Sequence, residues 1–232
     1  MERSALVSAL AEQVLGKQSS GAFRRVGVDG VDGAGKTWLA DELAAAVHDR
    51  GAPVERVSID GFHNPRDVRY RRGRDSPDGF FRDSYDYESF VSLVLRPFSQ
   101  GGDGAYVPAI HDVREERAVS PLRRLAAPGS VLIVDGIFLH RDELAPFWDY
   151  SIWLDVPFEV SVPRGAARGD GFGSSDPAAP SNRRYVDGQR IYLRECRPQE
   201  RASVVVDNTD LDEPFIVERP AVRTPPRCPG PV

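Results

Sequence analysis

The sequence has 232 residues, of which 41% are hydrophobic, and its formal net charge is −5 at pH 7. A chain of this length can bury the core of one medium-sized domain. The acidic balance argues against a general nucleic-acid-binding surface, and no apolar run approaches the roughly 18 residues of a membrane span. The two cysteines, Cys196 and Cys228, lack metal-ligand spacing, and the N-terminus does not look like a signal peptide. These features favour a reduced, cytoplasmic setting.

Apolar, β-rich runs alternate with helical patterns, which is typical of a parallel α/β sheet. The N-terminal stretch MERSALVSALAEQVLGKQ predicts an amphipathic helix. The predicted strands cover residues 25–29, 54–60, 131–135, 151–156 and 203–207. The predicted helices cover residues 36–50, 87–98, 158–168 and about 185–195.

Three stretches predict little regular structure. Residues 61–83 are rich in Arg, Gly, Asp and Pro, and residues 169–182 have the composition of a mobile flap. The end of the chain is rich in proline, which predicts a disordered tail over residues 213–232. We therefore expect a single domain over residues 1–212.

The stretch VGVDGVDGAGKTWLADELAAAV, residues 26–47, contains the pattern G-x-x-x-x-G-K-T of a phosphate-binding loop, or P-loop. Glycines let the backbone approach an anion closely, and the N-terminus of the following helix favours negative charge. Lys36 is predicted to reach the β- and γ-phosphates, and Thr37 to hold Mg²⁺. Trp38, on the first turn of the helix, is expected to pack in the core rather than to stack on adenine. The residues predicted to bind ATP are Gly30, Asp32, Gly33, Ala34, Gly35, Lys36 and Thr37.

Two carboxylates follow predicted strands at the edge of the sheet where the P-loop lies. Asp135 ends the apolar run VLIVD, as a Walker-B acid does, and is predicted to share Mg²⁺ with Thr37. Asp60 is placed to orient an acceptor hydroxyl and to take its proton, although a turn or helix-capping role is the alternative. His63 lies close by, either lining the acceptor pocket or exposed on a loop.

The P-loop and the stretches SIDGFH, RDSYDYESF, IHD and VLIVDGIFLH occur in the order seen in the uridine kinase and phosphoribulokinase-like family. Residues 24–210 resemble this family, and most closely its actinobacterial uridine kinase-like proteins. The resemblance implies a P-loop NTPase fold with a five-stranded parallel sheet of the nucleoside-monophosphate-kinase type. It also implies helices on the flanks of the sheet and a lid over ATP at about residues 164–184.

Roles for individual residues follow from the same resemblance. Asp60 matches the family's catalytic aspartate, and Asp83 matches the aspartate that binds ribose hydroxyls, with Tyr85 beside it. Arg164 and Arg168 match the lid arginines that grip the transferring phosphoryl group, a role that suits planar guanidinium groups. The next helix of the family resembles the stretch SNRRYVDGQRIY, which places Arg184 towards the acceptor.

The sequence also departs from the family at several positions. Asp135 replaces the usual glutamate, and His111 stands at the aromatic position that reads uracil, with no histidine after it. Glu115 and Glu116 occupy this region instead. An acidic pair favours a donor-rich or cationic group over the acceptor oxygens of uracil, so uridine and cytidine are predicted to be poor acceptors. Proline and glycine at positions 163, 165 and 169 predict a short or disordered lid helix.

Residues 69–74, with the sequence RYRRGR, form the one dense basic cluster. Such a cluster can clamp an anionic acceptor such as a sugar phosphate. The alternative is a basic loop that lies in solvent, and the sequence favours this second interpretation.

The predicted function is Mg²⁺-dependent transfer of the γ-phosphoryl group of ATP to a small-molecule hydroxyl, first of all on a nucleoside-like acceptor. A sugar phosphate or a pantothenate-type acceptor is the alternative. A guanine nucleotide switch would need an N-K-x-D motif, which the sequence lacks, and a non-catalytic nucleotide-binding protein is a third hypothesis. The expected partners are ATP and the acceptor, without nucleic acid or membrane, and self-association is left open.

Overall fold

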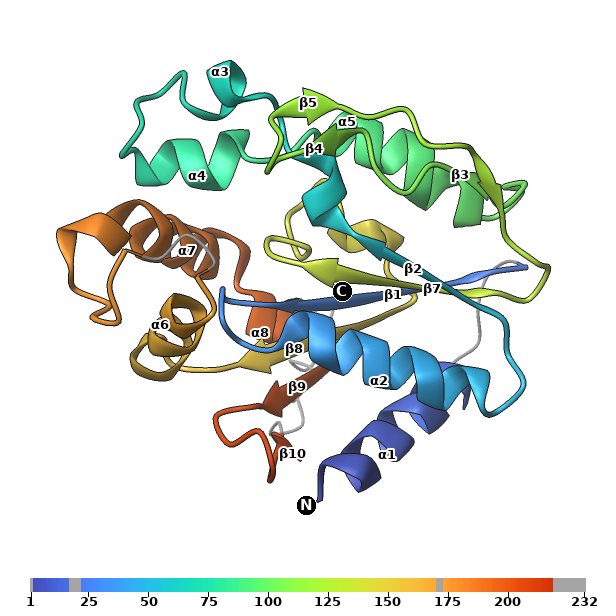
Figure 1. The fold of residues 1–232 in the computed structure, drawn as a ribbon. Helices are drawn as coiled ribbons and strands as arrows, with labels where there is room; N and C mark the ends of the chain where they lie inside the picture. Colours follow the sequence, from blue (N-terminus) through green and yellow to red (C-terminus); the bar gives the residue numbers. More distant parts are fainter. Residues whose placement is uncertain (1, 17–21, 170–172, 219–232) are drawn as a thin grey trace, which may run out of the picture.

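The structure is a computed structural model that describes residues 2–16, 22–169 and 173–218. Its centre is a six-stranded sheet in the order β10-β9-β8-β1-β7-β2 (Figure 1). Five strands run parallel, and the short edge strand β10 runs antiparallel to β9. The predicted five-stranded parallel sheet is confirmed, with β10 added. The strands of this sheet are β1 (Arg24–Gly30), β2 (Val54–Ser58), β7 (Val131–Gly136), β8 (Tyr150–Asp155), β9 (Val204–Asp207) and β10 (Phe215–Ile216).

The central strands are apolar on both faces because helices cover both sides of the sheet. Val26 and Val28 of β1 are fully buried, as are Ile133 of β7 and Leu154 of β8. Continuous apolar runs of this kind are typical of parallel strands. The strand order reverses beside β1, so the loop after β1 opens at the point where such sheets bind ligands.

Helices pack against the sheet and against one another. α2 covers β1, β2 and β7, and α1 packs on α2. α4 packs on α7, and Figure 1 shows both at the end of the sheet where the P-loop lies. No helix in the described residues is both long and apolar enough to cross a bilayer. The α-helices are α1 (Arg3–Gly16), α2 (Lys36–His48), α3 (Arg66–Arg69), α4 (Pro77–Asp83), α5 (Tyr87–Phe90), α6 (Phe158–Ala167), α7 (Arg183–Cys196) and α8 (Pro198–Arg201).

Shorter elements complete the fold. α5 continues through a π-helical turn, η2 (Val91–Leu95), into a 3₁₀ turn, η3 (Arg96–Phe98), so the predicted helix over 87–98 is present with altered winding. The other 3₁₀ turns are η1 (Ile59–Phe62), η4 (Ala145–Phe147) and η5 (Pro180–Asn182). Two small antiparallel pairs join β3 (Ala105–Tyr106) to β6 (Arg124–Leu125) and β4 (His111–Asp112) to β5 (Arg117–Ala118).

The prediction of irregular structure over residues 61–83 is wrong, since α3 and α4 both lie there. The start of α4 carries ordinary helix signals. Ser76 caps the helix by accepting a hydrogen bond from the Gly79 amide, and Pro77 occupies the first turn. The strand predicted over 54–60 ends earlier, at Ser58, and Asp60 lies in η1.

Structure also appears where a flap and a tail are predicted. α6 passes through Pro163 without a break and continues to Ala167. Residues 173–182 are tied together by the fully buried Asn182, whose side-chain amide donates to the carbonyl oxygens of Ser174 and Asp176. β10 lies within the predicted tail, so the folded region extends beyond residue 212. The rest of the flap, 170–172, and of the tail, 219–232, lie outside the described residues.

Gly33→Ala is expected to destabilise the fold more than Gly101→Ala. Both glycines have φ of +77°, so both substitutions carry the left-handed cost of roughly 1–2 kcal/mol. A methyl group on Gly33 would also lie 2.0 Å from the Ser161 carbonyl oxygen, whereas one on Gly101 meets no atom within 4 Å. Overpacking adds about 1–3 kcal/mol, which urea unfolding of the two variants can resolve. Equal losses of stability would contradict the packing of the P-loop on α6.

Candidate functional site

The P-loop leaves β1 at Gly30 and enters α2 at Lys36. Gly35 has φ of +91° and stands at the N-cap position, which only glycine adopts without strain. The Lys36 ammonium group donates to the Val31 carbonyl oxygen at 2.9 Å and therefore lies across the mouth of the loop. Gly33, Gly35 and Lys36 line one cavity at the N-terminus of α2, and a helix N-terminus with a cation beside it suits anion binding.

A buried carboxylate anchors the first residue of the loop. Asp29 of β1 is fully buried and accepts a hydrogen bond from the Gly30 amide at 2.8 Å. Its other oxygen accepts from the His140 ring at 2.7 Å and from the Tyr192 hydroxyl. Since a carboxylate can only accept, His140 carries its proton on Nδ1, and its Nε2 faces the Ser151 hydroxyl at 3.0 Å. Asp29 thus connects the P-loop to the segment after β7 and to α7.

A second contact from α7 fixes the middle of the loop. The Gln189 side chain, which is 1% exposed, accepts a hydrogen bond from the Asp32 amide at 2.6 Å. Its amide nitrogen donates to the Asp32 carboxylate at 3.2 Å and to the Tyr185 carbonyl oxygen at 3.1 Å. Gln189 thus occupies the Asp32 amide and also contacts the Asp32 carboxylate.

Two oxygen ligands suited to Mg²⁺ lie side by side at the carboxyl edge of the sheet. The Thr37 hydroxyl donates to the Asp135 carboxylate at 2.7 Å, and Arg56 holds the other carboxylate oxygen at 3.0 Å. Within the described residues no group of three or more His, Cys, Asp or Glu side chains could hold a metal by itself. A hydroxyl with one carboxylate fits Mg²⁺, which usually takes its other ligands from phosphates and water.

Asp60 projects from η1 as an exposed side chain with a partner that holds its position. The Tyr85 hydroxyl donates to its carboxylate at 2.8 Å. Burial, together with the charge of Asp60, raises the pKa of Tyr85 well above its ordinary value, so the phenol remains a donor. His63 donates from Nδ1 to the Asp60 carbonyl oxygen at 2.8 Å, which leaves its Nε2 as an acceptor. Burial also lowers the pKa of His63, so this ring is neutral at pH 7.

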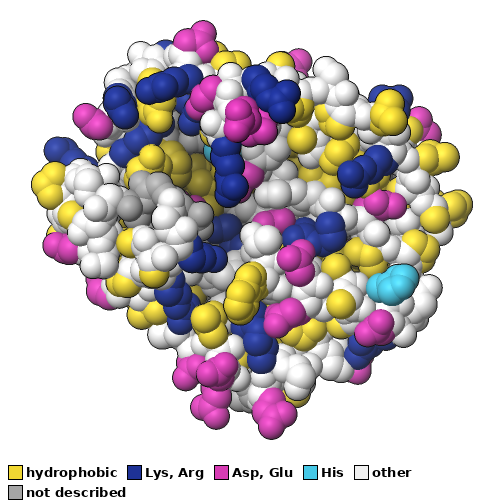
Figure 2. Space-filling view, viewed as in Figure 1, with side chains coloured by type: hydrophobic (Ala, Val, Ile, Leu, Met, Phe, Trp, Pro, Cys, Tyr) yellow, Lys and Arg dark blue, Asp and Glu magenta, His cyan; other side chains and the backbone are white. Residues whose placement is uncertain are grey.

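These groups line one cavity of about 830 Å³. Figure 2 shows Lys and Arg side chains around the hollow on this face of the molecule. The predicted site residues that line the cavity are Asp32, Gly33, Gly35, Lys36, Thr37, Asp60, His63, Tyr85, Asp135, Arg168 and Arg184.

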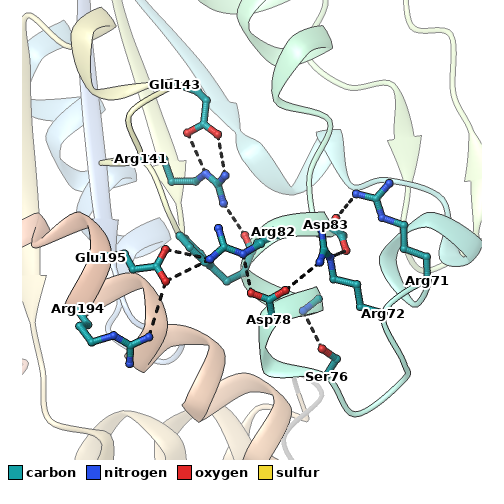
Figure 3. Close-up of polar contacts among 12 residues, drawn as sticks. Arg71, Arg72, Ser76, Asp78, Arg82, Asp83, Arg141, Glu143, Arg194 and Glu195 are labelled. Carbon is teal, nitrogen blue, oxygen red and sulfur yellow. Dashed lines mark hydrogen bonds and ion pairs between the residues drawn. The ribbon is translucent and has the colours of Figure 1, made fainter.

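Asp83 is absent from the lining and does not take the predicted place beside acceptor hydroxyls. Its side chain is 1% exposed and is held by Arg71 and by Arg72, the latter at 2.8 Å (Figure 3). Burial raises the pKa of Asp83, but hydrogen bonds from the two arginines outweigh it and lower the pKa. Asp83 does not reach the cavity because the basic cluster at 69–74 folds back on its carboxylate instead of lying wholly in solvent.

His111 is likewise buried and lies outside the cavity lining. Its Nε2 lies 3.5 Å from Glu116, which also pairs with Arg69. Glu116 is therefore already paired with basic groups of the protein. The predicted acidic pair that would favour a cationic acceptor does not form in the cavity.

Other predicted residues are turned to structural partners. Arg164 donates to the carbonyl oxygens of Asn208, at 3.0 Å, and Thr209, and it does not line the cavity. Gly30 and Ala34 lie in the loop without lining the cavity, and the Ala34 carbonyl oxygen accepts from the Asn208 amide at 2.7 Å. The expectation that Trp38 packs in the core is wrong, since its side chain is 65% exposed.

Several lining or supporting residues have no assigned role in the sequence analysis. Among the lining residues these are Phe80 and Arg114, and the supporting residues are Asp29, His140, Gln189 and Tyr192. Gln189 and Tyr192 lie one turn apart on a predicted helix. That pattern was visible in the sequence, but the partners come from distant segments.

No family model matches the chain. A uridine kinase-like protein 3 from Arabidopsis thaliana is 28% identical over 169 residues, which cover 70% of this chain and 34% of the relative. The chain thus aligns with about a third of that relative's length. A possible uridine kinase from Bacillus stearothermophilus superimposes with a TM-score of 0.69 at 23% identity and covers 88% of this chain and 99% of that one. Phosphoribulokinase from Rhodobacter spheroides gives a TM-score of 0.54 at 13% identity, over 80% of this chain and 70% of that one.

Gln189→Ala is expected to weaken nucleotide binding by about 5- to 30-fold, because it leaves the partly buried Asp32 amide without its acceptor and frees the middle of the loop. Isothermal titration with ATP and Mg²⁺ measures the effect. Gln199→Ala is the matched control, since Gln199 is exposed and makes one hydrogen bond, to Asp155, away from the cavity. The anchoring role of α7 is wrong if both variants bind ATP like the unmodified protein.

Proposed function

We propose that this chain, which is similar to a uridine kinase-like protein and shares its fold with a possible uridine kinase and with phosphoribulokinase, transfers the γ-phosphoryl group of ATP to a small-molecule hydroxyl. One observation carries the proposal. The P-loop, the Thr37–Asp135 pair and the exposed carboxylate of Asp60 all line a single cavity. A phosphate donor and a hydroxyl acceptor can therefore meet within it.

The nucleotide end of the cavity supplies positive charge and oriented donors. The P-loop amides and Lys36 meet the β- and γ-phosphates, and Arg168 meets the phosphoryl group in transfer. Mg²⁺ held by Thr37 and Asp135 would neutralise charge on the phosphate oxygens when bound. Since phosphoryl transfer needs little covalent chemistry from the protein, positioning and charge stabilisation provide most of the catalysis.

Asp60 acts at the other end as the base. Its carboxylate accepts a hydrogen bond from the acceptor hydroxyl, aims the hydroxyl oxygen at the γ-phosphorus and takes the proton as the new bond forms. Tyr85 fixes one carboxylate oxygen of Asp60 and leaves the second for the hydroxyl. The neutral His63 ring offers an acceptor from the same side.

The family resemblance points first to a nucleoside-like acceptor, with a sugar phosphate or a pantothenate-type compound as the alternative. The two nucleoside-specific contacts implied by the resemblance are not available in the structure, because Asp83 is paired with arginines and His111 lies outside the cavity. A non-catalytic role is disfavoured by the shared lining of Lys36 and Asp60.

Lys36→Ala is expected to lower turnover by roughly 10²–10³-fold while the fold is retained, since the ammonium group is placed to stabilise the negative charge of the phosphoryl group during transfer. ADP release in the presence of acceptor measures turnover, and circular dichroism checks the fold. A variant with nearly normal turnover would remove the P-loop from the mechanism.

Asp60→Asn is expected to lower kcat by about 10²-fold or more with little change in ATP affinity, because asparagine keeps the shape and loses the proton acceptor. Asp67→Asn, in nearby α3, is the control, since Asp67 is exposed and lies outside this cavity. Loss of ATP affinity with unchanged kcat would assign Asp60 to the metal or to structure instead.

A further inference from the structure

The acceptor end of the cavity is more basic than a neutral acceptor requires. We define this end by Asp60 and His63, by residues 69–85, by the β4–β5 turn and by the start of α7. Its lining side chains include Arg69, Arg114 and Arg184 but a single carboxylate, Asp60. The other lining carboxylates, Asp32 and Asp135, belong to the nucleotide end.

Arg184 is the most informative of these arginines. It is 7% exposed and lines the cavity, yet no described carboxylate forms an ion pair with it. Its guanidinium group donates to carbonyl oxygens of the 69–76 segment, which lie 3.0–3.4 Å away at Arg69, Gly73, Arg74 and Ser76. None of these bonds uses the Nε–H group. A buried guanidinium that is satisfied only by neutral dipoles is a strong site for an anion.

The surroundings of Arg184 favour binding of an anion to its guanidinium group. Its guanidinium carbon lies 4.8 Å from the centre of the Tyr70 ring and 5.6 Å from that of Phe80, so aromatic faces cover it. Burial lowers the pKa of Arg184; Tyr70, Tyr185 and the more distant carboxylate of Asp75 oppose this, and the positive charge of Arg69 lowers the pKa further. An anion in the cavity would offset both effects.

Arg114 comes from a different element. It lies in the exposed β4–β5 turn, which packs beside η1, where the Ile110 amide donates to the Gly61 carbonyl oxygen at 2.8 Å. Hydrogen bonds from the backbone amides of Glu115 and Arg114 lower the pKa of Asp112, and the Arg114 charge adds a smaller effect. The Arg114 side chain forms no ion pair with any described residue. Arg114 and Arg184 therefore approach the acceptor end from two different elements.

The remaining charges near this end are already balanced. Arg69 pairs with Glu116, and Arg71 and Arg72 pair with Asp83. The Asp83 carboxylate is thus neutralised by arginines of the protein itself. Arg114 and Arg184, which line the cavity, form no ion pair with a described carboxylate. We propose that the acceptor carries an anionic group, a phosphate or a carboxylate, which Arg184 and Arg114 bind while Asp60 takes the hydroxyl proton; this rests on the function proposed above.

Matched pairs of hydroxyl compounds test the proposal. The pairs are ribose and ribose 5-phosphate, uridine and uridine 5′-monophosphate, and glycerol and glycerate. Binding is measured by calorimetry with Mg²⁺ and ADP present, so that the nucleotide end is filled, and transfer by ADP release from ATP. The phosphate and carboxylate members of the panel distinguish the two kinds of anion.

In at least one pair the anionic compound is expected to bind about tenfold or more tightly than its neutral partner. Arg114→Ala should reduce that advantage by about tenfold and leave the KM for ATP unchanged. Arg123→Ala is the matched control, because Arg123 is also exposed and lies outside the cavity. Arg184→Lys, which keeps the charge, should retain part of the advantage even though the fork of donors is lost.

Two results would overturn the inference. One is equal or better binding of the neutral member in every pair. The other is an effect of Arg114→Ala on the KM for ATP instead of on the acceptor. Efficient, Asp60-dependent transfer to neutral acceptors alone would refute the anionic subsite and leave the kinase function intact. Arg114-dependent binding of anions without transfer from ATP to any of them would support the subsite and refute the kinase function.

Discussion

The site depends on one buried carboxylate, Asp29, at the carboxyl end of the central strand. Burial of an ionised carboxylate is costly unless hydrogen bonds compensate for the lost water. Here the Gly30 amide, the His140 ring and the Tyr192 hydroxyl supply them. The same bonds fix where the P-loop begins and where α7 lies. Because α7 also carries Gln189 and Arg184, the phosphate loop and the acceptor end are positioned from a common anchor.

The two ends of the cavity differ in how their charges are balanced. At the nucleotide end Asp135 is shared by Thr37 and Arg56, an arrangement that suits a metal ion and phosphate. At the acceptor end Arg71 and Arg72 neutralise Asp83, whereas Arg184 has only carbonyl partners. An acceptor that brings its own negative charge completes this balance. A neutral nucleoside would leave a buried guanidinium without a counter-ion.

Most of the sheet and the P-loop could be predicted from the sequence, because their signals are local. Apolar runs ending in Asp60 and Asp135 identify the carboxyl edge, and the spacing of Gly30, Gly35 and Lys36 identifies the loop. The acceptor end could not be predicted in the same way. The pairing of Asp83 with Arg71, and of Glu116 with Arg69, depends on how short helices and a hairpin fold back on η1. The composition of residues 69–74 predicts a loop in solvent. In the structure, arginines of this segment instead form ion pairs with Asp83 and Glu116.

The central claim is that the cavity joins a γ-phosphoryl group to a hydroxyl oxygen under the control of Asp60. Phosphorus NMR after incubation with ATP labelled with ¹⁸O in the γ-phosphoryl group, Mg²⁺ and a mixture of hydroxyl compounds tests it most directly. The account predicts a new phosphate ester at an alcohol oxygen that carries the label from ATP, formed by the unmodified protein and nearly lost in Asp60→Asn. Label found only in inorganic phosphate, or an ester formed equally by the Asp60→Asn variant, would contradict it.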